Sequence, residues 1–168
     1  IPDPLNPRYS YAAGKMISEM MLINSNFFKR SIIFRPHNIY GPNMGYNHVI
    51  PEIIQKIFLS KKKLKIQGSG NHTRSFCYID DFVNAFNFLI KKGKNKNIYN
   101  IGTQEEIKII LLVNKIIELS GKKISIEKSK EKFGSPIRRC PDISKIKKLG
   151  FKPKNNLDDG LKKTFEWY

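Results

Sequence analysis

Two side chains near the start of the chain could move a proton between them. Tyr11 and Lys15 lie four residues apart, and the pattern around them predicts a helix over 10–26 with Ser10 as its N-cap. Residues at that spacing share one face of a helix. Because an ammonium group favours the phenolate form of a nearby tyrosine, Tyr11 could act as a base below its ordinary pKa of about 10. The alternative is a pair on a solvated helix surface.

The chain has 168 residues, enough for one domain with a core or for part of a larger protein. It carries 31 lysines and arginines against 14 acidic residues, a formal net charge of +17. Such an excess can indicate nucleic acid, an acidic surface or a phosphorylated ligand as the partner. The lysines are scattered, however, and the densest run, Lys61–Lys63, falls between a predicted helix and a predicted strand. We therefore expect most lysines to coat the surface.

The residue spacing points neither to a metal nor to a membrane. Cys77 and Cys140 are far apart and the three histidines show no ligand spacing. We therefore expect reduced thiols in a cytoplasmic protein and no metal site. No apolar stretch approaches the ~20 residues that a membrane span needs. The chain begins at Ile1 without an initiator Met, which we interpret as a piece of a longer protein.

Helices and strands alternate along the sequence, which predicts an α/β fold. The segment Ser31–Arg35 is rich in β-branched residues, apolar on both faces and followed by Pro36, a pattern typical of a buried parallel strand. Few other segments are apolar enough for such a sheet, so the remainder predicts a smaller mixed lobe. Further strands are expected at 64–67, 74–79, 97–102 and 124–126, and helices at 48–59, 80–91, 105–119, 142–149 and 157–168.

Five segments together carry a resemblance that covers essentially the whole chain. Tyr11–Lys15 has the form Tyr-x-x-x-Lys, and Arg35–Pro42 reads Arg-Pro-His-Asn-Ile-Tyr-Gly-Pro. The Gly-Ser-Gly turn and the Thr-Arg-Ser-Phe run within 67–81 match a substrate-lobe hairpin, and segments 97–102 and 138–142 complete the set. In this order, the segments resemble those of extended short-chain dehydrogenases/reductases, specifically the nucleotide-sugar epimerases and dehydratases.

The resemblance implies the C-terminal part of a Rossmann-like doubly wound sheet plus a smaller mixed α/β substrate-binding lobe. Residues 1–45 would end the NAD-binding domain. Residues 46–168 would form mainly the nucleotide-sugar lobe, with 80–102 returning to the sheet. The glycine-rich loop that binds the dinucleotide pyrophosphate is not in this sequence. The upstream Ser or Thr of the catalytic triad is not there either, so we expect this chain alone to be inactive.

The resemblance also implies roles around an NAD cofactor. Tyr11 would remove a proton from a sugar hydroxyl while a hydride leaves the same carbon for the nicotinamide. Lys15 would lower the pKa of Tyr11 and hydrogen-bond the nicotinamide ribose. Pro36 and His37 follow a strand end, where ligands collect in open α/β sheets, and their backbone would border the nicotinamide. Pro36 could equally be a simple strand terminator.

Two arginines are implied as ligands of a substrate diphosphate, since a guanidinium can bind phosphate through two parallel hydrogen bonds. Arg74 follows a glycine turn and opens a strand, so its side chain can face the cleft. Arg139 resembles the second diphosphate arginine, and Arg138 competes with it for that role. The alternatives are a surface ion pair for Arg74 and pairing with Asp142 for either of the others.

Five more residues are implied in substrate binding. Asn38 would hydrogen-bond the diphosphate region, or be an ordinary loop residue. His48 and Val49 begin a helix whose free amides suit a phosphate, although ordinary helix capping explains them equally well. Lys65 and Gln67 resemble the stretch whose backbone flanks the nucleotide base.

The predicted enzyme is an NAD-dependent nucleotide-sugar epimerase like the UDP-sugar 4-epimerases, functioning as a homodimer without nucleic acid or membrane as partner. A 4,6-dehydratase is the first alternative and a decarboxylase the second. A basic nucleic-acid-binding module or an inactive remnant are rival hypotheses. The first of these needs exposed aromatics beside basic residues. We instead expect five phenylalanines to be buried, namely Phe34, Phe58, Phe82, Phe86 and Phe88.

Overall fold

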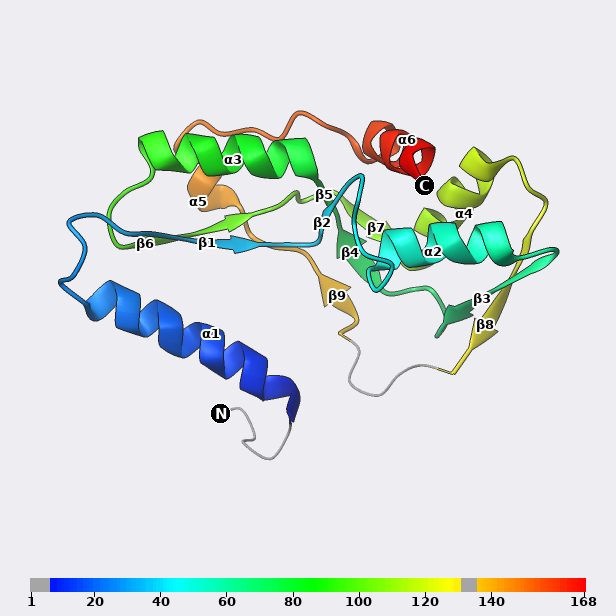
Figure 1. Ribbon diagram of the computed structural model, residues 1–168, viewed down its shortest axis with the longest axis horizontal. Coiled ribbons are helices and arrows are strands. Elements are labelled where there is room, and N and C mark those ends of the chain that lie inside the picture. Colours follow the sequence, from blue (N-terminus) through cyan, green and yellow to red (C-terminus); the bar gives the residue numbers. More distant parts are fainter. Residues whose placement is uncertain (1–6, 131–135) are drawn as a thin grey trace.

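A computed structural model describes residues 7–130 and 136–168 (Figure 1). One part is built on two parallel strands, β1 (Ile32–Pro36) and β6 (Asn97–Ile101), which pair from Ile32 with Asn97 to Pro36 with Ile101. Helix α3 (Ile79–Lys92) packs on this pair, and helix α1 (Pro7–Asn24) lies on the other side of it (Figure 1). The parallel pairing of the strand after α1 is therefore confirmed.

The other part is a mixed α/β lobe. Three small sheets lie there or at its border, and two of them are parallel pairs. The third has the order β7-β4-β9, antiparallel on one side of β4 and parallel on the other. The strands are β2 (Ile39–Tyr40) with β5 (Cys77–Tyr78), β3 (Lys63–Gln67) with β8 (Ser125–Ser129), and β7 (Glu106–Lys108), β4 (Thr73–Ser75) and β9 (Arg138–Arg139).

Each part has its own apolar core. In the first, α3 contributes Ala85 and Leu89, which pack with β6 and with the short helix α5 (Ser144–Lys147). In the lobe, the apolar faces of three amphipathic helices meet over the small sheets. These helices are α2 (Val49–Leu59), α4 (Ile109–Ser120) and α6 (Leu157–Trp167). The α/β class with parallel strands is as predicted.

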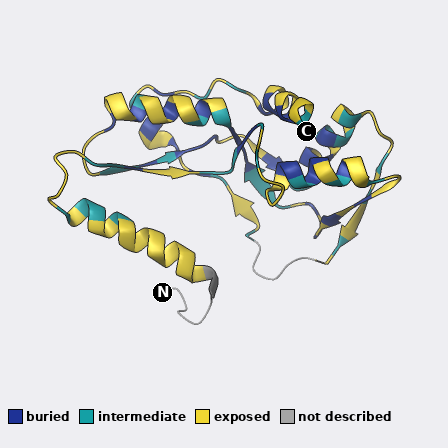
Figure 2. Cartoon of the chain, in the orientation of Figure 1, coloured by how far each residue is buried: buried dark blue, intermediate teal, exposed yellow. Residues whose placement is uncertain are grey.

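Helix α1 makes little contact with the rest of the structure, and its residues are mostly exposed (Figure 2). The expectation that Ser10 caps this helix is wrong, because the helix begins at Pro7. Proline suits the first position of a helix, where its missing N–H has no partner in any case. Glu19 ties α1 to β1 through an ion pair with Arg35.

The expected hairpin at 67–81 is also wrong. Strand β3 pairs with β8, and β4 pairs with β7 and β9, so the two predicted hairpin strands enter different sheets. The turn between them uses Gly68 and Gly70 at positive φ, 69° and 78°. Glycine reaches that region at little cost. The predicted helix at 105–119 begins at Ile109, since residues 106–108 pair with β4.

Strand β1 was expected to be buried on both faces, and this is wrong. Ile33 is buried, whereas Phe34 is 37% exposed and rests against the ring edges of Phe82 and Phe86, at centroid distances of 6.1 and 5.3 Å. Phe86 is likewise 37% exposed and Phe58 is 48% exposed. The predicted burial is therefore wrong for these three phenylalanines, while Phe82 and Phe88 are partly buried against the core of this part. Of the helices in the described ranges, none is long and apolar enough to cross a membrane.

Candidate functional site

A groove runs from the carboxyl end of β1 past the start of α2 to β3. It consists of three hollows of about 520, 480 and 160 Å³ that share lining residues. Pro36, Asn38 and Arg139 line the first and the second hollow, and Val49 lines the second and the third. We call the three together the central groove. Its place outside the end of a parallel strand is where ligands bind in open α/β sheets.

Asn38 fixes the backbone at the head of the groove. Its φ of 43° lies in the left-handed region, which asparagine tolerates better than most residues. Its Nδ2 donates to the carbonyl of Ser75 at 2.8 Å, and its own carbonyl accepts from the amide of Cys77 at 3.1 Å. These bonds hold the end of β1 against β4 and β5. Asn38 is therefore a fixed element of the groove wall.

His37 is oriented by a short polar chain that the sequence did not reveal. Its Nε2 lies 3.2 Å from Oδ1 of Asn100, and Nδ2 of Asn100 donates to the carbonyl of Asp142 at 2.8 Å. Gly102 packs closely against the base of this side chain. A Cβ built on Gly102 would lie 3.3 Å from Cβ of His37. Asn100 belongs to the segment 97–102 that carries the resemblance, but its contact with His37, just after β1, follows only from the parallel pairing.

Arg74 and Arg139 are neighbours on one face of the β7-β4-β9 sheet, because they are register partners across β4 and β9. Arg74 is held in place by donating from Nη1 to the carbonyl of Thr73 and from Nη2 to that of Pro136, each at 2.7 Å. Burial and the charge of Arg139 lower the pKa of Arg74. Within the described residues, neither guanidinium forms an ion pair with a carboxylate. The strand register thus places two positive charges side by side on this face.

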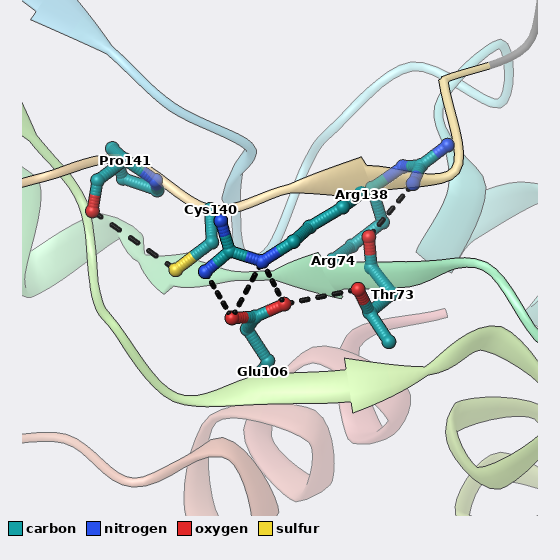
Figure 3. A network of polar contacts seen from close by, with 6 residues as sticks. All are labelled: Thr73, Arg74, Glu106, Arg138, Cys140 and Pro141. Carbon is teal, nitrogen blue, oxygen red and sulfur yellow. Dashed lines mark hydrogen bonds and ion pairs between the residues drawn. The ribbon is translucent and has the colours of Figure 1, made fainter.

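Arg138 points to the opposite face of this sheet, toward Glu106 (Figure 3). Its guanidinium binds the carboxylate of Glu106, with Nη2 2.5 Å from Oε1, and Thr73 donates its hydroxyl to Oε2 of the same carboxylate at 2.9 Å. The expected partner, Asp142, instead accepts from the amide of Ser144. The alternative that Asp142 pairs with an arginine of β9 is therefore wrong for Arg138.

The remaining expected ligands line the 480 and 160 Å³ hollows of the groove. His48 is the N-cap residue of α2 and makes no side-chain cap bond. Val49 follows it and faces both hollows there. Lys65 and Gln67 line the smallest hollow together with Arg74. The groove thus collects nine of the expected site residues: Pro36, His37, Asn38, His48, Val49, Lys65, Gln67, Arg74 and Arg139.

Tyr11 and Lys15 do not line the hollows of the central groove. They do share one face of α1, with Nζ of Lys15 5.5 Å from the ring centroid of Tyr11, and Tyr11 is 74% exposed. Glu19 lies one turn beyond Lys15 on the same face. Its carboxylate accepts from Nε of Arg35 at 2.7 Å. Through Glu19, this face of α1 is tied to Arg35 of β1.

Sequence comparison identifies the class of protein. Residues 2–102 match the model of the NAD dependent epimerase/dehydratase family. The chain therefore belongs to that family, and the expected resemblance is confirmed.

Particular relatives include both dehydratases and epimerases. The chain is 36% identical to a trifunctional UDP-glucose 4,6-dehydratase/3,5-epimerase/reductase of Arabidopsis thaliana, over 98% of this chain and 25% of that protein. It is 34% identical to the human dTDP-D-glucose 4,6-dehydratase, over 99% of this chain and 50% of that protein. The chain thus spans a quarter to a half of the length of these curated relatives.

Solved structures give the same range of relatives. The UDP-glucose 4-epimerase of Thermotoga maritima with UDP-glucose superimposes with a TM-score of 0.86 and 27% identity, over 99% of this chain and 54% of that one. The dTDP-glucose 4,6-dehydratase of Bacillus anthracis in complex with NAD gives a TM-score of 0.81 and 28% identity, over 98% and 53%. The Rossmann-like α/β class is thereby confirmed.

Proposed function

We propose that the protein is an NAD-dependent nucleotide-sugar 4-epimerase acting on a UDP-sugar, and that this chain supplies its substrate-binding part. The observation that carries the proposal is the pair Arg74 and Arg139. Two guanidinium groups lie side by side on the wall of a groove at the end of a parallel strand. A nucleotide sugar offers a diphosphate that two such groups can bind through charge-assisted hydrogen bonds.

The other groove residues complete such a site in this proposal. Asn38 contacts the diphosphate region at the head of the groove, and His48 and Val49 present the amides at the start of α2. Lys65 and Gln67 flank the base in the smallest hollow. The sugar then lies toward the 520 Å³ hollow beside Pro36 and His37.

The residues of this chain fit an NAD cofactor at that same end. Pro36 and His37 line an open hollow, and the Tyr11–Lys15 face of α1 is tied to Arg35 of β1 through Glu19. When bound, NAD supplies the acceptor and later the donor of a hydride. Tyr11, as phenolate, takes the proton of the sugar hydroxyl, and Lys15 stabilises the phenolate. Because the arginines bind the diphosphate and leave the sugar free to turn, C4 of the oxidised sugar can present either face to the returning hydride, while Tyr11 gives the proton back to the oxygen.

A 4,6-dehydratase is the second candidate, and a decarboxylase the third. The two curated relatives described above carry 4,6-dehydratase activity in their names, which favours the second candidate. We also propose the division into 1–45 and 46–168 with 80–102 in the sheet. A homodimer is supported by the exposed apolar residues of α1, namely Met16, Ile17, Met20 and Met21.

The test is to incubate the full-length protein together with NAD and one substrate at a time, and to follow the products by mass spectrometry and NMR. The three substrates are UDP-glucose, dTDP-glucose and UDP-glucuronate. An epimerase yields a product of unchanged mass with inverted configuration at C4. Loss of one water from a glucose substrate identifies a dehydratase, and loss of carbon dioxide from UDP-glucuronate identifies a decarboxylase. Unchanged substrate in every incubation would overturn the proposal.

A further inference from the structure

We propose that Glu106 is a positioning residue for Arg139: by binding Arg138 on one face of β9, it commits Arg139 to the opposite face, beside Arg74 in the central groove. The inference rests on the proposed function, since it concerns the same diphosphate-binding arginines. It answers a question that the sequence raises, because β9 consists of two consecutive arginines. Neighbouring residues of a strand point to opposite faces, so only one of the two can share the face of Arg74.

On the face of the sheet opposite Arg139, Arg138 and Thr73 both bind the carboxylate of Glu106 (Figure 3). Nε of Arg138 lies 3.0 Å from both carboxylate oxygens of Glu106, and Nη2 lies 2.5 Å from Oε1. Thr73 donates to Oε2 of the same carboxylate at 2.9 Å. Glu106 stands on β7, Thr73 on β4 and Arg138 on β9, so one carboxylate connects all three strands of the sheet. Hydrogen bonds from Arg138 and Thr73 lower the pKa of Glu106, which keeps it ionised.

The register of β9 depends on this contact. The strand is short and lies at the edge of its sheet, where β4 is its neighbour. Its backbone link includes the bond from the Thr73 amide to the carbonyl of Ile137, at 2.9 Å. A slip of one residue would exchange the two faces of such a strand, and so exchange the roles of Arg138 and Arg139. A carboxylate on one face removes this ambiguity, because it gives Arg138 a partner that Arg139 cannot reach from the opposite face.

Charge favours the same arrangement. Arg74 and Arg139 already lie beside each other, and the charge of Arg139 contributes to the lowered pKa of Arg74. Arg138 lines the same 520 Å³ hollow as Arg139. Pairing with Glu106 neutralises this third positive charge. The groove then offers an anion two arginines in one fixed geometry.

The test compares the E106Q variant of the full-length protein with the wild type by calorimetric titration with UDP and with dTDP. The substitution keeps the size of the side chain and removes its charge. D158N serves as the matched control, because it breaks the exposed Lys115–Asp158 pair, 2.7 Å long, outside the groove. We expect E106Q to weaken binding of the nucleoside diphosphates by roughly 5- to 10-fold, and D158N by less than about twofold.

A double-mutant cycle separates positioning from a general structural role. In an R139Q background, E106Q should cause no further loss, because the residue through which it acts is gone. The exchange variant E106R/R138E, which restores an ion pair, should recover binding to within about twofold of the wild type. Equal affinities of E106Q and wild type, or an undiminished effect of E106Q in the R139Q background, would overturn the inference and leave the proposed function standing. Failure of the wild type to bind either nucleoside diphosphate would overturn both.

Discussion

Arg35 at the end of β1 binds both carboxylate oxygens of Glu19, and this ion pair joins α1 to the parallel strands. Glu19 shares its helix face with Lys15 and Tyr11, so the pair sets where that face points. Hydrogen bonding with Arg35 lowers the pKa of Glu19, and the pair is therefore present at neutral pH and lost as the pH falls below the ordinary range of a glutamate.

The E19Q variant tests what this pair does. Because half of the Arg35 side chain is exposed, the pair contributes at most about 1 kcal/mol to folding. Its effect on turnover should be larger, roughly 10-fold in kcat, since a small displacement of the proton-transfer groups is costly. Steady-state kinetics and thermal unfolding check the two effects. The control is D158N, which breaks the exposed Lys115–Asp158 pair outside the central groove. Equal kinetics of E19Q and D158N would contradict this role.

Tyr11 is predicted to be the catalytic base. Replacing it with phenylalanine removes the hydroxyl that exchanges the proton, and general acid–base catalysis contributes about 10²- to 10⁴-fold. We expect kcat of the Y11F variant to fall by that factor while affinity for UDP stays unchanged. Tyr9 provides the matched control, since it is an exposed tyrosine on the same helix. If Y9F and Y11F are equally active, Tyr11 has no part in the chemistry.

Arg74 is predicted to bind the diphosphate. The R74A variant loses hydrogen bonds from a charged group, each worth about 1.5–3 kcal/mol, so the Kd for UDP should rise by at least 10-fold. Lys62 is an exposed cation outside the groove, and K62A should leave the Kd unchanged. Titration at several salt concentrations distinguishes a local contact from a general effect of net charge. Equal affinities of R74A and K62A would remove Arg74 from the site.

Cys77 is predicted to be inert in the folded protein. Burial raises the pKa of the Cys77 thiol to about 12, from an ordinary value of 9.0. Folding therefore favours the protonated thiol. Its contribution to the free energy of unfolding is fully present below pH 9 and is lost as the pH rises toward 12. Thiol titration with a chromogenic disulfide at pH 8 should modify the partly exposed Cys140 and leave Cys77 unmodified until denaturant is added. Rapid modification of Cys77 in the native wild-type protein and in the C140S variant would show that Cys77 is accessible.

Asp81 is predicted to be a main structural anchor of the lobe. Its buried carboxylate accepts from the amides of Lys154 and Asn155, each at 2.9 Å, and so fixes the segment before α6 to the start of α3. In the D81N variant, the NH₂ group of the asparagine points at one of these amides and cannot accept its hydrogen bond. The loss of this bond should lower the free energy of unfolding by about 1–3 kcal/mol. Chemical denaturation measures this loss, with the exposed neighbour variant D80N as control. Matching denaturation midpoints of the two variants would contradict the prediction.

Local sequence signals predicted much of the fold because they act within a few residues. The helix from Val49 to Leu59 has an apolar period and an early proline, and Gly121 ends α4 at a φ of 65°. Residues 106–108 behaved differently, since their strand exists only through pairing with β4. The exposure of Phe34 was also missed, because periodicity predicts which side chains are apolar and says nothing of how much neighbouring structure covers them.

The same distinction between local and distant signals applies to the residues of the candidate site. Arg74 was predicted as a diphosphate ligand from the glycine turn before it, and Arg139 from the family resemblance; the structure places the two side by side. Asn100 and Glu106 were missed, because their importance comes from partners that are distant in sequence, His37 and Arg138. Only the strand pairings bring these residues together. A resemblance to a family predicts which residues meet a ligand more readily than it predicts which residues hold them in place.

The walls of the central groove come from segments spread between Pro36 and Arg139. During synthesis on a ribosome, a nascent chain that stops short of β9 therefore holds Arg74 without its neighbour. In the proposed function, tight nucleotide binding then requires a chain that is complete as far as β9. A bound nucleotide would shift the folding equilibrium by mass action and would delay cleavage by proteases across the whole lobe at once.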